Sequence, residues 1–220
     1  MSFTKLLYRK CLSKWFSVIM VFVLLLNGFE IAYSKMNLSP YPTPDEINFL
    51  PKWAQVVVLT GPRTNPPPNL MRERKKLKEQ YGDMAIDAGH HFAAALNWIN
   101  RYYRSIGDNY KGVAEDRIFA LKKAIDEFQF MRGRLSRADS LYAMLLFYEA
   151  IVYREQGNFF NANKNYREII DLRPKYPAGY INYADFLKSV GRSEDAQKIL
   201  SIGLEKTDGS EAIKKHMEKN

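Results

Sequence analysis

Cysteine is almost absent from this chain of 220 residues, in which Cys11 is the single example. One cysteine cannot form a disulfide within the chain. Because Cys11 precedes an apolar run that has the pattern of an export signal, we expect the mature chain to have neither a thiol nucleophile nor a thiolate metal site.

Histidine is also scarce, since the chain has only His90, His91 and His216. Neighbouring residues of a helix point about 100° apart, so we do not expect His90 and His91 to share a metal ion. We expect His91 to pack or to form a hydrogen bond inside the first helical hairpin. The sequences HExxH, CxxC, GxGxxG and GxxxxGK[ST], which would indicate zinc, redox or phosphate chemistry, do not occur.

Acidic residues do not form a recognisable catalytic pair. Pairs such as Asp126-Glu127 and Glu194-Asp195 have basic neighbours, which is typical of solvated helix faces. We therefore predict a protein that is not an enzyme, with no catalytic residue, no metal site and no cofactor.

The first 34 residues have the pattern of an export signal. Basic residues precede an apolar run of eleven residues, Phe16–Leu26, and Ala32 and Ser34 then have the spacing that a signal peptidase reads. The run is shorter than the roughly 20 residues that span a membrane. We predict export to the periplasm, with residues 1–34 either removed or kept as an anchor in the inner membrane.

Proline is concentrated in one region, because eight of the ten prolines lie between Pro40 and Pro68. We therefore divide the chain into an N-terminal signal or anchor over 1–34, a proline-rich extended segment over 35–70, and a helical domain over 71–220.

Two motifs interrupt the proline-rich segment. Thr43–Glu46 has the pattern of a capping box, which predicts a short helix that ends near Leu50. Lys52–Gly61 is rich in valine, as a strand would be, although no partner strand is evident. We expect the segment to lie across the helices as a strap, with the holding of a partner as the alternative.

Glycine marks a repeat, since Gly157 and Gly191 lie 34 residues apart. Each follows an apolar helical pattern and precedes an amphipathic one, as a glycine that ends a helix in the left-handed conformation would do. Small residues recur at the same spacing, where two helices must approach closely. They are Ala150, Ala162, Ala184 and Ala196. Large residues recur where the space between helices must be filled. They include Leu146, Tyr153, Tyr166 and Ile170.

A unit of two helices with this period, and with Pro174 ending the second helix, resembles the tetratricopeptide repeat (TPR) family. The resemblance covers two repeats, 143–176 and 177–210. It implies an all-α solenoid in which the first helix of each unit lines a concave, partner-binding face.

A degenerate unit over about 84–136 precedes these repeats. Ala124 repeats the second-helix pattern, although it lies 38 residues before Ala162 rather than 34. The stretch GHHFAAAL, Gly89–Leu96, is similar to the start of the first repeat in some small exported repeat proteins of proteobacteria.

The expected fold is therefore all-α, with about three TPR-like helical hairpins and a C-terminal capping helix. The helices are expected over Leu70–Tyr81, Met84–Ser105, Val113–Arg134, Ala138–Gln156, Phe159–Leu172, Ala178–Val190, Ser193–Lys206 and Ser210–Lys219.

By matching positions, the resemblance implies a groove of mixed apolar and charged character, which is suited to a peptide segment or helix of another protein. Its residues would be Phe92, Leu96, Ile99, Phe147, Ile151, Arg154, Ile181, Asp185 and Lys188. The family's carboxylate-clamp version has Lys and Asn where this chain has Phe147 and Ile151, so we do not expect binding of that type. Alternatively, some of the nine residues pack beneath the proline-rich segment.

Positive charge is modest and local. Removing residues 1–34 takes away four basic residues and one acidic residue, so the net charge of +9 falls to +6. The one basic patch lies on a predicted helix and comprises Arg72, Arg74, Lys75, Lys76 and Lys78. It is either a solvated face or a contact for an anionic membrane surface or cell wall. Export makes nucleic acid an unsuitable partner.

These features predict an exported scaffold or adaptor that binds another envelope protein or peptide segment. The alternative is a structural factor that associates with the membrane or cell wall through the basic helix.

Overall fold

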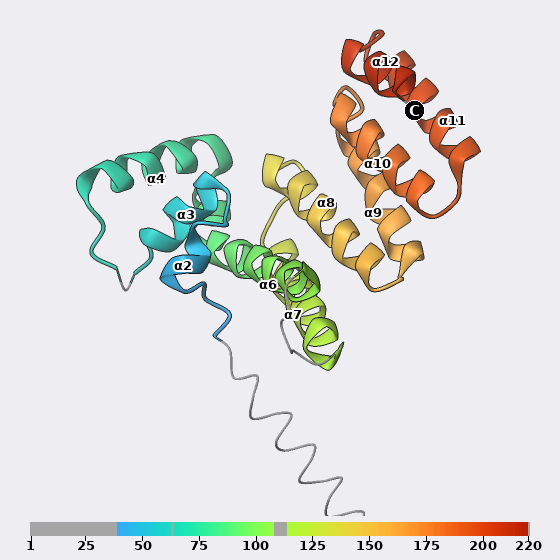
Figure 1. Ribbon diagram of the computed structural model, residues 1–220. Helices are drawn as coiled ribbons and strands as arrows, with labels where there is room; N and C mark the ends of the chain where they lie inside the picture. The colour runs from blue at the N-terminus through green and yellow to red at the C-terminus, as the bar shows by residue number, and fades with distance from the viewer. Residues whose placement is uncertain (1–38, 63, 108–113, 220) are drawn as a thin grey trace, which may run out of the picture. The chain divides into compact units, whose positions relative to one another are not determined.

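Every regular element in the described part of the chain is an α-helix, as predicted. The structure, a computed structural model, describes residues 39–62, 64–107 and 114–219. The predicted signal or anchor over 1–34 lies outside these residues. The helices are α2 (Pro44–Ile47), α3 (Lys52–Leu59), α4 (Pro68–Tyr81), α5 (Asp83–Asp87), α6 (Gly89–Gly107), α7 (Ala114–Arg132), α8 (Ser140–Glu155), α9 (Phe159–Leu172), α10 (Pro177–Ser189), α11 (Ser193–Lys206) and α12 (Glu211–Glu218) (Figure 1).

Three helical hairpins make up most of the described chain. Their interfaces, α6 with α7, α8 with α9 and α10 with α11, are the most extensive between helices (Figure 1). Consecutive hairpins meet where α7 packs on α8 and where α9 packs on α10. Helices α9 and α11 begin and end at the predicted residues, because strong local stop signals bound them.

The two repeat glycines end helices as predicted. Gly157 has φ 72° and Gly191 has φ 79°, in the left-handed region that an L side chain rarely adopts. The next amide reaches back into the helix in each case, from Asn158 N to Tyr153 O and from Arg192 N to Leu187 O, both at 2.8 Å. This hydrogen bond pairs a carbonyl of the last turn, which would otherwise be left without a partner.

The small residues of the repeat lie at helix contacts. Ala150, Ala162, Ala184 and Ala196 are each 0% exposed. Larger side chains at these positions would overfill a closely packed interior and force the helices apart. The repeat period therefore reflects packing between helices, as the sequence predicts.

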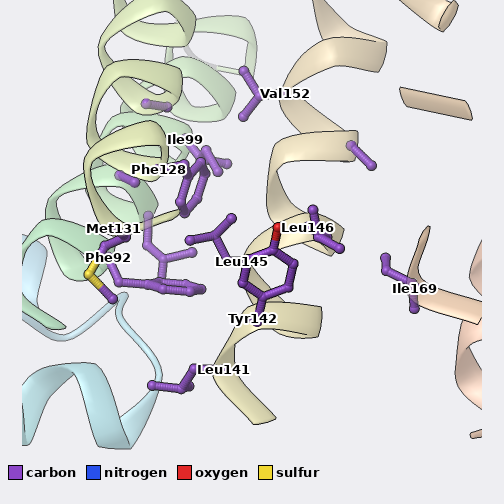
Figure 2. Close-up of a cluster of buried hydrophobic side chains, with 14 of the residues drawn as sticks. Phe92, Ile99, Phe128, Met131, Leu141, Tyr142, Leu145, Leu146, Val152 and Ile169 are labelled. Atoms are coloured by element: carbon purple, nitrogen blue, oxygen red, sulfur yellow. The ribbon is translucent and has the colours of Figure 1, made fainter. Parts of the chain in front are cut away.

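The first hairpin shares one core with the second. Phe92 on α6 and Phe128 on α7 meet edge to face, with ring centroids 5.3 Å apart. Tyr148 on α8 stacks against Phe128 at 6.4 Å. Leu145 and Tyr142 of α8 complete this apolar cluster between the hairpins (Figure 2).

The proline-rich segment is not extended over its whole length, which corrects the sequence prediction. Residues from Pro40 onward belong to one compact unit with the hairpins. The valine-rich stretch, which could have been a strand, is the helix α3, because Ala54 and Val57 are buried one helical turn apart, and Leu50 is buried just before the helix. Packing on α6 outweighs the preference of valine for strands, and a helix satisfies its own backbone hydrogen bonds.

The capping box at the start of α2 is present, and this short helix ends at Ile47 rather than near Leu50. A second difference concerns Met84–Ser105, which forms two helices, α5 and α6. They meet at Gly89, where an added β-carbon would lie 3.2 Å from Val57 Cγ1. The close approach of α3 to Gly89 therefore coincides with the break between α5 and α6.

The last helix, α12, covers the third hairpin by packing on α10 and α11. Its Ile213 is 0% exposed. A β-carbon at Gly203 of α11 would lie 2.6 Å from Tyr180 Cγ and 2.9 Å from Ile213 Cδ1. A glycine is therefore required at this point for the three helices to meet.

Candidate partner-binding surface

Six of the nine predicted binding residues lie on α8 and α10 with accessible side chains. Phe147, Ile151, Arg154, Ile181 and Lys188 are partly exposed, and Asp185 is exposed. We refer to these six residues as the α8–α10 face. Phe147 and Ile181 also pack against the apolar core, whereas Ile151 is not among the residues that do so. Ile151 is thus the apolar side chain of this face that the core engages least.

Tyr166 of α9 lies beneath the α8–α10 face and supports it. Its ring contacts Phe147 at 6.4 Å and stacks on Tyr183 and Phe186 at 5.8 and 5.1 Å. Burial raises the pKa of Tyr166 to about 12, so its hydroxyl stays protonated at neutral pH. The charges of Arg154 and Asp185, two of the three charged residues of the face, also act on this hydroxyl.

Arg154 is held in place by neighbours from two helices. Its guanidinium contacts Glu155 Oε1 at 2.6 Å and donates to the Tyr103 hydroxyl at 3.4 Å. Tyr102 and Tyr103 of α6 donate to the two oxygens of Glu155 at 3.0 and 3.1 Å. Burial opposes ionisation of Glu155, but the hydrogen bonds from Arg154 and Tyr102 outweigh it and lower the pKa of the carboxyl. This network fixes Arg154 at the edge of the face.

Asp185 faces the capping helix. His216 Nε2 of α12 lies 2.9 Å from Asp185 Oδ1. The carboxylate is still about half exposed, at 52% of its side chain. Asp185 can therefore accept a hydrogen bond from a bound partner while it contacts His216.

The first hairpin does not contribute to the surface, which corrects the prediction for Phe92, Leu96 and Ile99. They are 0%, 4% and 6% exposed and belong to the apolar core. Trp53 of α3 covers Phe92, with ring centroids 5.0 Å apart. The alternative in which part of the predicted groove packs beneath the proline-rich segment therefore holds for Phe92.

The basic patch on α4 is largely paired with acidic residues. Arg74 and Lys78 contact Asp87 of α5 at 2.8 and 2.9 Å, so they join two helices. Lys76 and Lys75 pair along the helix with Glu73 and Glu79, at 3.0 and 4.0 Å. Arg72 is exposed. The patch therefore offers an anionic surface much less positive charge than its composition indicates.

The two adjacent histidines have separate partners. His91 Nδ1 lies 2.6 Å from Glu127 Oε2 of α7, which confirms the prediction of a hydrogen bond within the first hairpin. His90 Nδ1 lies 3.0 Å from the carbonyl oxygen of Asp87. The imidazole rings are tilted toward each other, with centroids 4.2 Å apart and planes inclined by 41°. Their Nδ1 atoms have different partners.

Sequence reasoning missed Tyr103 and Glu155, because the contact between them crosses 52 positions of the chain and no local pattern marks it.

Among the described residues, no three histidine, cysteine, aspartate or glutamate side chains are grouped so that they could hold a metal ion. Within that same part of the chain, none of the helices has the length and apolar character needed to cross a membrane.

Comparison with known proteins does not assign a family. The sequence matches no protein-family model, and no curated protein is significantly similar to it.

Proposed function

We propose that this protein is a non-enzymatic, TPR-type adaptor that is exported to the bacterial envelope and binds another protein through the α8–α10 face. The observation that carries the proposal is the contrast between equivalent positions of the hairpins. Phe92 and Leu96 are buried on α6, whereas Phe147 and Ile151 remain partly exposed on α8. The second hairpin therefore leaves accessible the positions that are buried on the first.

The TPR assignment rests on the 34-residue period together with buried alanines and left-handed glycines at matching positions. The proposal of export rests on the N-terminal sequence alone, with its basic residues, apolar run and small residues at a cleavage spacing. Mass measurement of the mature N-terminus would test cleavage after Ser34.

The chemistry of the α8–α10 face suits a peptide segment or helix of another protein. Apolar side chains at Phe147, Ile151 and Ile181 would bury apolar residues of the partner. Arg154, Asp185 and Lys188 supply charges of both signs, which favours one register of a bound segment over others. A mixed surface of this kind selects a partner by shape and charge together.

The test is capture of a partner from native membranes with the full-length chain as bait. We expect one envelope protein to be retained at high salt and to be lost with Ile151→Asp, because a charge would replace an apolar contact. Ile202→Asp is the matched control, since Ile202 is 42% exposed on α11, away from the face. Equal capture by the two variants would contradict the proposal.

The alternative function, attachment of the chain to an anionic surface through α4, predicts a different binding result. In that case anionic vesicles or peptidoglycan would retain the chain, and neutralising Arg72, Lys75 and Lys76 would abolish retention. Salt would also weaken such binding, because exposed charges are screened.

A further inference from the structure

A carboxylate is completely buried where the first hairpin meets the second. Glu149 of α8 is 0% exposed. Its Oε2 accepts from Arg132 Nη1 of α7 at 3.1 Å and from Asn165 Nδ2 of α9 at 2.9 Å. Its Oε1 is also buried, and no hydrogen-bond donor of the protein reaches it. Glu149 therefore joins its own helix to α7 and α9 while one of its carboxylate oxygens is unsatisfied.

A second carboxylate competes for the same cation. Arg132 Nη2 contacts Glu168 Oε2 of α9 at 3.1 Å, and Arg132 Nε donates to the Tyr142 hydroxyl at 3.1 Å. Arg137, from the turn before α8, also pairs with Glu168 at 3.0 Å. The positive charge of Arg132 is thus divided between two acids, and Glu149 receives only part of it.

The surroundings of Glu149 favour its protonated form. Burial raises the pKa of Glu149, and the nearby Glu168 adds to the rise, whereas Arg132 and Asn165 oppose it without cancelling it. The charge of Glu149 also acts on Tyr153 of α8, and burial and Glu149 together raise the pKa of Tyr153. An ionised Glu149 is therefore costly in the closed joint.

We propose that Glu149 is a proton-controlled lock between the α6/α7 and α8/α9 hairpins, which closes the joint when it binds a proton and favours opening when it is ionised. Opening means a separation of α7 from α8 that lets water reach the carboxylate. The lock does not require the α8–α10 face to bind a partner.

The direction of the pH effect follows from linkage. Water at the opened joint returns the pKa of Glu149 to its ordinary range, so the closed state binds the proton more tightly than the open state. Opening is most frequent above the pKa of the closed state. The frequency of opening falls by at most about tenfold per pH unit as the pH drops toward the ordinary pKa of a glutamate. Opening is least frequent below that pKa.

Hydrogen exchange of the full-length chain in mild detergent tests the lock. After correction for the intrinsic exchange rate, we expect amides at the end of α7 and in α8 to exchange several-fold faster near pH 7.5 than near pH 5. Amides of α11 serve as an internal reference and should show no such change. A corrected rate at the joint that does not depend on pH would overturn the proposal.

Two variants separate the lock from general acid sensitivity. Glu149→Gln imitates the protonated side chain, so the joint should exchange slowly at both pH values. Glu168→Gln is the matched control, and it should keep a response of the same sign. Persistence of the full response in Glu149→Gln would overturn the proposal.

If Glu149→Gln does not fold, carbon-13 titration of the Glu149 carboxyl in the unmodified chain decides the question. The lock requires a titration midpoint above the ordinary range of a glutamate, about 4.3. A midpoint at or below that range would refute it.

Discussion

Trp53 of α3 meets Phe92 of α6 edge to face, with ring centroids 5.0 Å apart and planes inclined by 79°. Edge-to-face packing adds to the gain from burying two large apolar rings. The contact attaches a helix from the proline-rich segment to the first hairpin. It also removes Phe92 from the surface, which limits the proposed binding face to α8 and α10.

Trp53→Ala should destabilise the chain, because it removes the ring that covers Phe92. Trp53 is partly exposed, so we expect a loss of about 2 to 3 kcal/mol, below the range for a fully buried aromatic residue. The loss is measured as a lower midpoint of chemical denaturation. Phe160→Ala is the control, because Phe160 is 79% exposed, and its midpoint should match that of the unmodified chain. A similar midpoint for both variants would show that α3 is not held on α6 in this way.

Gly203→Ala should weaken the attachment of α12. The added β-carbon would lie 2.6 Å from Tyr180 Cγ, so α10, α11 or α12 has to move. We expect a cost of about 1 to 3 kcal/mol, typical of overpacking, which thermal unfolding would detect. Gly133→Ala is the matched control, because its β-carbon would have no neighbour closer than 3.7 Å. No difference in melting temperature between the two variants would contradict the close contact of α10, α11 and α12.

Glu46 should make the stability of the chain sensitive to strong acid. Hydrogen bonds from Arg101 lower the pKa of Glu46 from 4.5 to about 2. A depressed pKa in the folded state adds stability above the unfolded pKa, and this contribution is lost as the pH falls through the folded value. The advantage of the unmodified chain over Glu46→Gln should therefore shrink between pH 4.5 and about 2.

The measurement for Glu46 is the free energy of unfolding against pH for both chains. Above pH 5 their difference should be constant, since Glu46 is then ionised in the folded and unfolded states alike. Glu149→Gln should change the pH dependence in the opposite sense, because burial raises rather than lowers the pKa of that carboxyl. Parallel curves for the unmodified chain and Glu46→Gln below pH 4.5 would show that the contact with Arg101 does not shift the titration of Glu46.

Local signals in the sequence were enough to predict the helices of the three hairpins and their pairing. Glycines at 157 and 191 end helices through their own backbone freedom, and the alanines at 150 and 184 mark helix contacts wherever the two helices lie. Side chains within one turn of each other govern these features, so a period along the chain is sufficient to find them.

Contacts between distant parts of the chain were decided only by the tertiary structure. Lys52–Leu59 is a helix rather than a strand because α6 offers an apolar surface for its buried stripe. Trp53 of α3 also covers Phe92, which is buried, as Leu96 and Ile99 are, although sequence reasoning had assigned all three to the binding surface. Glu149 gives no sign in the sequence that it is buried between Arg132 and Asn165, because its environment depends on residues from three helices. Helix formation is encoded locally, whereas which face of each helix remains exposed depends on what the rest of the chain places against it.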